Sequence, residues 1–155
     1  MSSARAQANQ KLYLAKIQLA AWQRALAARE VAAATLTQAF LPAVRQHLLG
    51  AYGWFLLAVS GQEQLPGEPP RCCAELPAIA AGMAVPGEIR EFEQLETSGW
   101  LAALLAEPDE AVQQARTRDN LASAAPVLPA VEDAGQWIDQ LEAVFQRMSD
   151  SLDEC

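Results

Sequence analysis

The feature that most constrains this chain is a long apolar stretch at residues 36–60, whose one permanently charged side chain is Arg45. At the 100° step of an α-helix, small or apolar residues cover nearly the whole circumference, including the side that holds Gly50 and Gly53. Such a helix must be surrounded by others, because each large side chain gains about 1.5–3 kcal/mol on burial. The stretch is therefore predicted to be the central helix of an all-α protein.

Alternatives stay open at three points of this helix. Gly50 and Gly53 each cost about 1 kcal/mol in a helix interior. Close approach of another helix would offset that cost, and a ligand slot against bare backbone is the functional alternative. Pro42 either kinks the helix or lies in its first turn, with Thr35 or Thr37 as the capping residue.

The stretch is too interrupted to cross a membrane. A spanning helix needs about 20 strongly apolar residues, whereas the uncharged run after His47 contains two glycines and ends near Ser60. Residues 1–10 are polar, and the apolar positions that follow alternate with charged and amide side chains, unlike a signal peptide. We therefore expect no membrane association and a cytoplasmic location.

The cysteine pattern supports the same compartment. Cys72, Cys73 and Cys155 are an odd set with two adjacent members, which fits neither a disulfide framework nor a zinc site. Reduced thiols are typical of the cytoplasm. A redox role for the vicinal pair is the alternative, and no metal or other cofactor is predicted.

Composition and periodicity predict one helical domain over residues 1–155. The chain is 52% hydrophobic, and no segment alternates apolar and polar residues as a half-buried strand would. We predict an up-and-down bundle of about four main helices, with shorter helices in an irregular middle section. The expected order is a helix from Ser3 to about Arg29, a reversal within 29–37, the central helix, a loop at 61–71, short helices near 71–83, 86–96 and 98–107, a linker at 116–130, and a final helix from about Pro129 whose last residues fray.

Charge is divided unevenly along the chain, whose net charge is −8. Residues 1–61 hold six Lys and Arg against one Glu, and residues 62–155 hold five Arg against eighteen Asp and Glu. The first helix is thus a basic rod, and we expect its charges to lie opposite the acidic final helix. A surface for nucleic acid or an acidic partner is the alternative. Nucleic-acid binding is disfavoured by the acidic total.

Arg45 and its neighbours form the candidate ligand site. On the helical wheel Arg45 falls within the apolar arc, so its guanidinium must reach solvent or find a carboxylate. The structural interpretation is an ion pair with an acid of the middle or final helix. The functional interpretation is an anionic ligand held in the bundle by Arg45, His47, Tyr52 and Trp54.

Recognisable catalytic patterns are missing from the sequence. His47 is the single histidine, and we interpret it as a packed or half-exposed structural residue. There is no Glu-x-x-His pair for a di-iron centre, and no glycine-rich phosphate loop ending in Lys-Ser or Lys-Thr. No catalytic residue and no metal ligand are predicted, and the chain is not expected to be an enzyme.

Three segments carry a resemblance to a known group of proteins. NQKLYLAKIQLAAW, QHLLGAYGWFL and SGWLAALL together resemble a small bacterial family of uncharacterised all-helical proteins, a domain of unknown function. This resemblance implies a cytoplasmic helical bundle and no named catalytic residue. More distantly the chain is similar to HEPN-type bundles, some of which are ribonucleases. Their motif places an arginine several residues before a histidine, whereas Arg45 precedes His47 by two, which argues against nuclease activity.

Three functions follow from these observations. The leading hypothesis is a non-enzymatic interaction or adaptor module that binds another protein or a second copy of itself. The alternative is a bundle that binds or senses a small anionic ligand in the region of Arg45 and His47, with a cavity beside Gly50 and Gly53. The third is an inactive relative of the HEPN nucleases.

Overall fold

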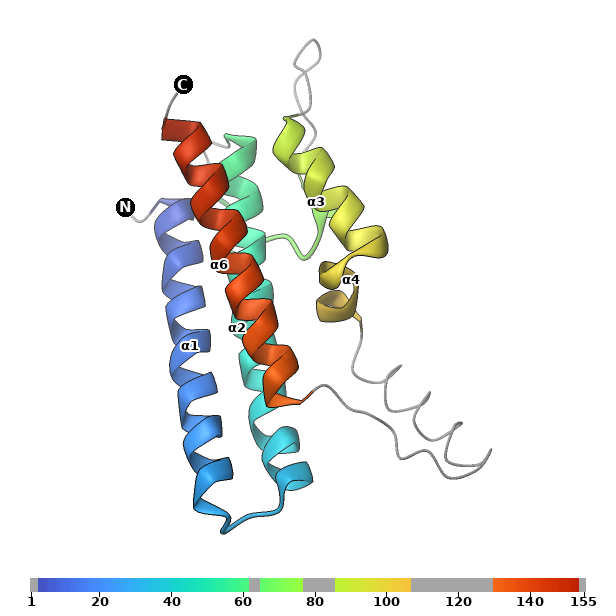
Figure 1. Cartoon of the computed structure of the whole chain (residues 1–155). Coiled ribbons are helices and arrows are strands. Elements are labelled where there is room, and N and C mark those ends of the chain that lie inside the picture. The colour runs from blue at the N-terminus through green and yellow to red at the C-terminus, as the bar shows by residue number, and fades with distance from the viewer. Residues whose placement is uncertain (1–2, 62–64, 77–85, 107–129, 154–155) are drawn as a thin grey trace.

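The chain is described by a computed structural model at residues 3–61, 65–76, 86–106 and 130–153. Every regular element in these ranges is helical, which confirms the predicted all-α bundle (Figure 1). The elements are α1 (Ala4–Ala28), α2 (Ala33–Ser60), a 3₁₀ turn (Cys73–Glu75), α3 (Gly87–Ser98), α4 (Trp100–Leu105) and α6 (Val131–Asp153). In the described ranges no helix is both long and apolar enough to cross a membrane.

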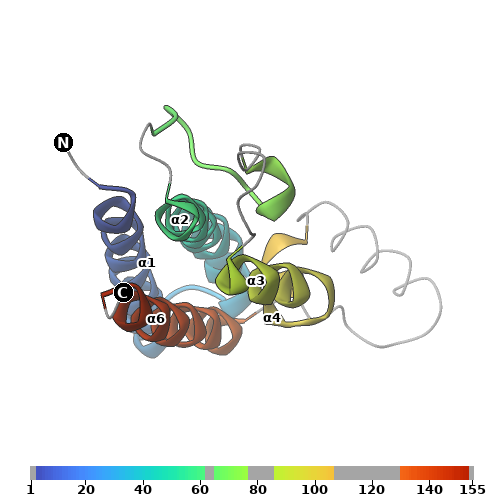
Figure 2. The same ribbon diagram turned by 90° about the horizontal axis from the view of Figure 1, so that it is seen from above.

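Three long helices form the body of the fold. α1 and α2 make an antiparallel hairpin, and α6 lies along both of them (Figures 1 and 2). The short helices α3 and α4 lie beside α2 and α6, on the side away from α1 (Figure 2). α3 and α4 confirm the short helices predicted near 86–96 and 98–107. The predicted short helix at 71–83 is described only to residue 76, where it is a 3₁₀ turn, and its remainder lies outside the described residues.

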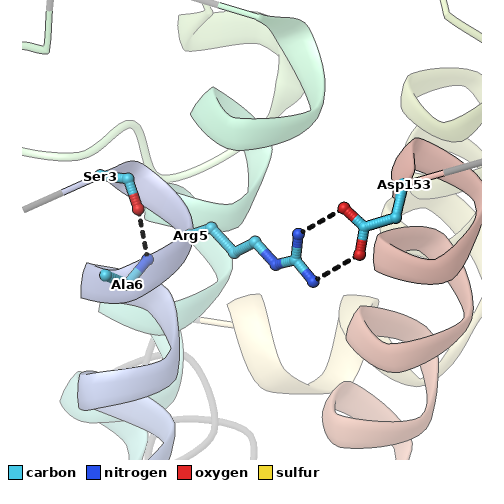
Figure 3. Close-up of polar contacts among 4 residues, drawn as sticks. All are labelled: Ser3, Arg5, Ala6 and Asp153. Carbon is cyan, nitrogen blue, oxygen red and sulfur yellow. Dashed lines mark hydrogen bonds and ion pairs between the residues drawn. The ribbon is translucent and has the colours of Figure 1, made fainter. Parts of the chain in front are cut away.

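α1 begins and ends as its sequence predicts. The Ser3 hydroxyl accepts a hydrogen bond of 3.0 Å from the amide of Ala6, which caps the first turn (Figure 3). Arg29 ends the helix in the left-handed conformation at φ 54°, so the chain reverses inside the predicted window. The buried stripe that faces α2 and α6 consists of Ala4, Ala8, Leu12, Ala15 and Trp22.

α2 starts earlier than predicted and has no side-chain cap. Its N-cap is Ala32, so the predicted caps Thr35 and Thr37 are wrong; both lie inside the helix, where the Thr37 hydroxyl donates to the carbonyl of Ala33. Pro42 is an interior residue, so the alternative that placed it in the first turn is wrong. Its missing amide bond is tolerated because the turn before it, around Gln38, is exposed to water.

The centre of α2 is buried on nearly all sides, as its apolar circumference predicts. Leu48, Tyr52 and Leu56 have no exposed surface. Phe55 stacks on Phe145 of α6 with ring centroids 4.0 Å apart and meets Phe92 of α3 edge-on at 6.1 Å. These aromatic contacts join α2, α3 and α6 into one core.

Gly53 shows why α2 contains glycine. A Cβ built there would lie 2.1 Å from the carbonyl oxygen of Pro70, so residues 65–76 rest directly on the α2 backbone. The close approach is therefore made by this loop and not by the helix we expected. At Gly50 a Cβ would lie 3.5 Å from the Lys11 Cγ of α1, an ordinary contact.

Ion pairs between α1 and α6 confirm that the basic first helix lies opposite the acidic final one. Arg5 makes a paired contact with the carboxylate of Asp153, at 3.1 and 3.2 Å (Figure 3), and Lys16 Nζ lies 2.6 Å from Glu142. The expected fraying of the last residues is wrong as far as Asp153, because Arg5 binds that carboxylate and the helix continues through it. Residues beyond it lie outside the described part.

Candidate functional site

A cleft of about 690 Å³ lies between α1, α2 and the loop that rests on Gly53. We call it the α1–α2 cleft. It is lined by Gln7 and Lys11 from α1, by Gln46, His47, Leu49, Gly50 and Trp54 from α2, and by Gly67, Glu68, Pro69, Pro70 and Arg71 from the loop.

The α2 wall of the cleft follows from helical spacing. His47, Gly50 and Trp54 are separated by three and four residues, so they lie on one face of the helix. Gly50 has no side chain to fill the space between the other two. Trp54 is 5% exposed and gives this wall an apolar part. The predicted cavity beside the α2 glycines is therefore present at Gly50, while at Gly53 the loop covers the backbone.

The α1–α2 cleft brings the Lys11 ammonium and the His47 imidazole together. Burial lowers the pKa of His47 below its ordinary value of 6.5, and the nearby Lys11 ammonium lowers it further, because a second positive charge beside the first is unfavourable. In the part of the chain that is described, Lys11 has no ion pair with a carboxylate. Glu68 and Arg71 add one charge of each sign to the loop wall.

The predicted site residues do not form one group. His47 and Trp54 line the α1–α2 cleft, whereas Arg45 and Tyr52 do not. Arg45 Nε donates a 2.8 Å hydrogen bond to the carbonyl oxygen of Leu104, and its Nη2 donates to that of Ala106. Its guanidinium thus binds the C-terminal carbonyls of α4, which carry partial negative charge.

Tyr52 belongs to a buried polar cluster behind the loop. Its hydroxyl donates to the carboxylate of Glu96 on α3, which also accepts a 2.9 Å hydrogen bond from the backbone amide of Cys73. Burial, and then the hydrogen bond to Glu96, raise the pKa of Tyr52 far above its ordinary value. Tyr52 therefore stays protonated and, through Glu96, connects α2 to the loop and to α3.

The thiol of Cys73 lies in the same cluster, 3.6 Å from the Tyr52 hydroxyl oxygen. Burial raises the pKa of the Cys73 thiol to about 12, although the hydrogen bond with Tyr52 acts in the opposite direction. Since the thiolate is the reactive form, this thiol is unreactive at neutral pH. The arrangement gives no support to a redox role for the pair Cys72 and Cys73.

Sequence reasoning missed Lys11, which lines the cleft, and Glu96, which binds the loop. Lys11 was one of several basic residues distributed around α1, and its proximity to His47 depends on how α1 and α2 pack. Glu96 was one of many acids in the second half of the chain. A cue for the loop wall was Gly53, whose cost within a helix indicates a close approach of other backbone.

The helices and the α1–α2 cleft together define an all-α bundle protein with a polar cleft beside the central hairpin. In the described ranges no group of three His, Cys, Asp or Glu residues could hold a metal ion. The chain belongs to a family of unknown function, DUF6586, whose model matches residues 1–155. That membership agrees with the resemblance to an uncharacterised helical family. No curated protein and no solved structure matches the chain significantly.

Proposed function

We propose that this chain is a non-enzymatic binding protein whose α1–α2 cleft takes a small anionic ligand. The observation that carries the proposal is the placement of Lys11 and His47 in one cleft, beside Gly50. The proposal takes up the alternative of an anionic ligand near His47 in place of the leading hypothesis of an adaptor module, and it replaces Arg45 with Lys11 as the principal cation.

The Lys11 ammonium, which has no ion pair with a carboxylate in the described ranges, and the neighbouring His47 imidazole favour an anion. Each of the two groups raises the energy of the other when both are charged, and a bound carboxylate or phosphate converts that repulsion into two attractions. Because the cleft is partly closed by the loop, these attractions are screened less than they would be on an open surface. Glu68, on the opposite wall, would repel an anion that lies too close to the loop.

The size and lining of the cleft indicate an organic anion. Ligand sites in proteins typically measure about 300–1,000 Å³, and the α1–α2 cleft falls within that range at about 690 Å³. Leu49, Trp54 and Pro69 supply an apolar part of the lining, and Gln7 and Gln46 supply amide groups that can donate or accept hydrogen bonds. A carboxylate or phosphate ester with an apolar body fits this combination.

The surroundings of His47 favour binding over catalysis. In the described ranges no hydrogen bond joins His47 to a serine or cysteine that it could activate as a nucleophile. Arg45, two positions before His47, binds carbonyl groups at the C-terminal end of α4. These contacts support a binding role and give no support to a nuclease related to the HEPN group.

The proposal is tested with inorganic phosphate and a panel of carboxylate and phosphate metabolites, by thermal shift and calorimetry at low ionic strength. We expect one or more of these anions to stabilise the full chain in a saturable manner. The Lys11→Met variant should lose most of this effect, because it removes a cation from the cleft and keeps the aliphatic stem.

Arg24→Met is the matched control, since Arg24 is an exposed cation of the same helix and does not line the cleft. It should bind the anion as the parent chain does. Equal losses in both variants would show nonspecific attraction to a basic helix. No saturable response to any member of the panel would contradict the proposed function.

A further inference from the structure

We propose that a second copy of this chain docks on the outer face formed by α1 and α6, so that the protein is a two-fold symmetric dimer. We call this surface the α1–α6 face. It is hollowed by a groove of about 430 Å³ that is lined by Arg5, Asn9, Leu12, Tyr13 and Lys16 from α1 and by Glu142, Phe145, Gln146, Ser149 and Asp150 from α6. The proposal does not depend on the ligand cleft.

Two large apolar side chains on this side of α1 are exposed in the described part of the chain. Tyr13 is 60% exposed at the edge of the groove, and Ile17, one turn further along α1, is 48% exposed. Large exposed hydrophobic residues beside a groove favour a protein contact over contact with water. The short helices α3 and α4 lie on the other side of the bundle, so none of the described helices covers the α1–α6 face (Figure 2).

Charge complementarity identifies the occupant. Within the α1–α6 face the basic residues belong to α1 and the acidic ones to α6, so the ion pairs Arg5–Asp153 and Lys16–Glu142 both run from positive α1 to negative α6. A two-fold axis parallel to the helices places α1 of one copy against α6 of the other at the same height. Each ion pair then faces the same ion pair of the other copy, with the positions of the positive and the negative charge exchanged. Four charges of alternating sign therefore lie together.

The other two-fold arrangement is unfavourable. An axis across the helices would place α1 against α1 and α6 against α6, with like charges facing each other. The sequence therefore selects one self-complementary geometry, in which the charge pattern that joins α1 to α6 within a chain also joins two chains. Such isologous contacts are the commonest form of oligomer.

The face is large enough for a stable contact. α1 has 25 residues and extends about 37 Å. Two adjacent helices are about 20 Å wide, so each copy would cover about 700 Å² of the other copy's surface. The total of about 1,400 Å² falls within the range of specific protein interfaces. Tyr13 and Ile17 would supply its apolar centre, above the buried Leu12 and Phe145 of the groove floor.

The proposal is tested by the mass of the full chain in solution. Sedimentation equilibrium measures this mass from low micromolar to near-millimolar concentration. The net charge of −8 opposes association, so the measurement is made at about 0.15 M salt, where charges more than about 8 Å apart are screened. We expect a monomer–dimer equilibrium. The double change Tyr13→Glu and Ile17→Glu should weaken it by about tenfold or more, because it places new carboxylates at the centre of the contact.

The control is Val31→Glu, since Val31 is 48% exposed in the turn between α1 and α2, away from the face. This variant should dimerise as the parent chain does, and all three proteins should have the same helical circular dichroism. A parent chain that is monomeric at every concentration overturns the proposal and leaves a helix of a different protein as the occupant of the groove. A dimer that survives the double change, or that Val31→Glu also dissociates, overturns it as well.

Discussion

Lys11 of α1 and His47 of α2 lie close enough for the lysine charge to lower the pKa of the histidine. The two residues are far apart in the sequence and meet because α1 and α2 pack as an antiparallel hairpin. Gly50 lies beside them without a side chain, and Pro69 and Pro70 also line the cleft. This relationship is the basis of the proposed binding function, and it can be measured without knowing the ligand.

Replacement of Lys11 by Met should raise the pKa of His47. The variant removes the neighbouring positive charge, so the imidazolium becomes easier to form, while the part of the shift caused by burial remains. The imidazole proton shifts in NMR spectra report this pKa directly. The control Arg24→Met should leave the titration unchanged, and an unaltered pKa in Lys11→Met would mean that the two groups do not interact.

His47 should make the folded state less stable as the pH falls. Since its pKa is below 6.5 when folded, the unfolded chain takes up the proton first, and the free energy of unfolding decreases from about pH 6.5 downward. Urea titrations between about pH 7 and pH 5.5 avoid the range of ordinary carboxyl groups. His47→Asn should flatten this dependence, and an equally steep decrease in the variant would show that another group is responsible.

The two glycines of α2 should respond in opposite ways to alanine. Gly50→Ala should raise the free energy of unfolding by about 0.5–1 kcal/mol, because alanine favours the helix and the nearest atom, in Lys11, is 3.5 Å from the new Cβ. Gly53→Ala should lower it by about 1–3 kcal/mol, since its Cβ would collide with the Pro70 carbonyl oxygen. Equal effects in chemical denaturation would contradict the close approach of the loop.

Glu96 should hold the loop wall of the cleft in place. Glu96→Ala leaves the Tyr52 hydroxyl and the Cys73 amide without their acceptor, which we expect to cost about 1–3 kcal/mol for each buried group. Amide exchange should also become faster in residues 65–76. The exposed neighbour Glu93 is the control, and Glu93→Ala should change stability by less than about 0.5 kcal/mol. Unchanged exchange in the Glu96 variant would mean that the loop is held by other contacts.

The helices were predictable because they depend on local pattern. The buried stripe of α1 and the apolar circumference of α2 are periodic in the sequence, and Ser3 is a residue type that caps helices. The start of α2 was misplaced because the alanine-rich segment before Leu36 has no strong cap or helix breaker. There the boundary depends on the length of the turn that begins at Arg29.

The candidate site was predictable only in part, because it is built from three segments. His47 and Trp54 were found on the helical wheel of α2, which is a local property. The same wheel grouped Arg45 and Tyr52 with them, and it could not show that α4 supplies carbonyl acceptors to the first and α3 a carboxylate to the second. Which partner from a distant segment a side chain contacts depends on how the helices pack. The periodicity of one helix carries no information about that packing.

The most direct test of the proposed function is the pKa of His47 with and without a bound anion. Two NMR titrations of the full chain, one in chloride and one at equal ionic strength in phosphate or in an anion selected by thermal shift, give this comparison. An anion between Lys11 and His47 stabilises the imidazolium, so the pKa should rise in the second titration and rise much less in Lys11→Met. Identical curves in both media would contradict an anion site in the α1–α2 cleft.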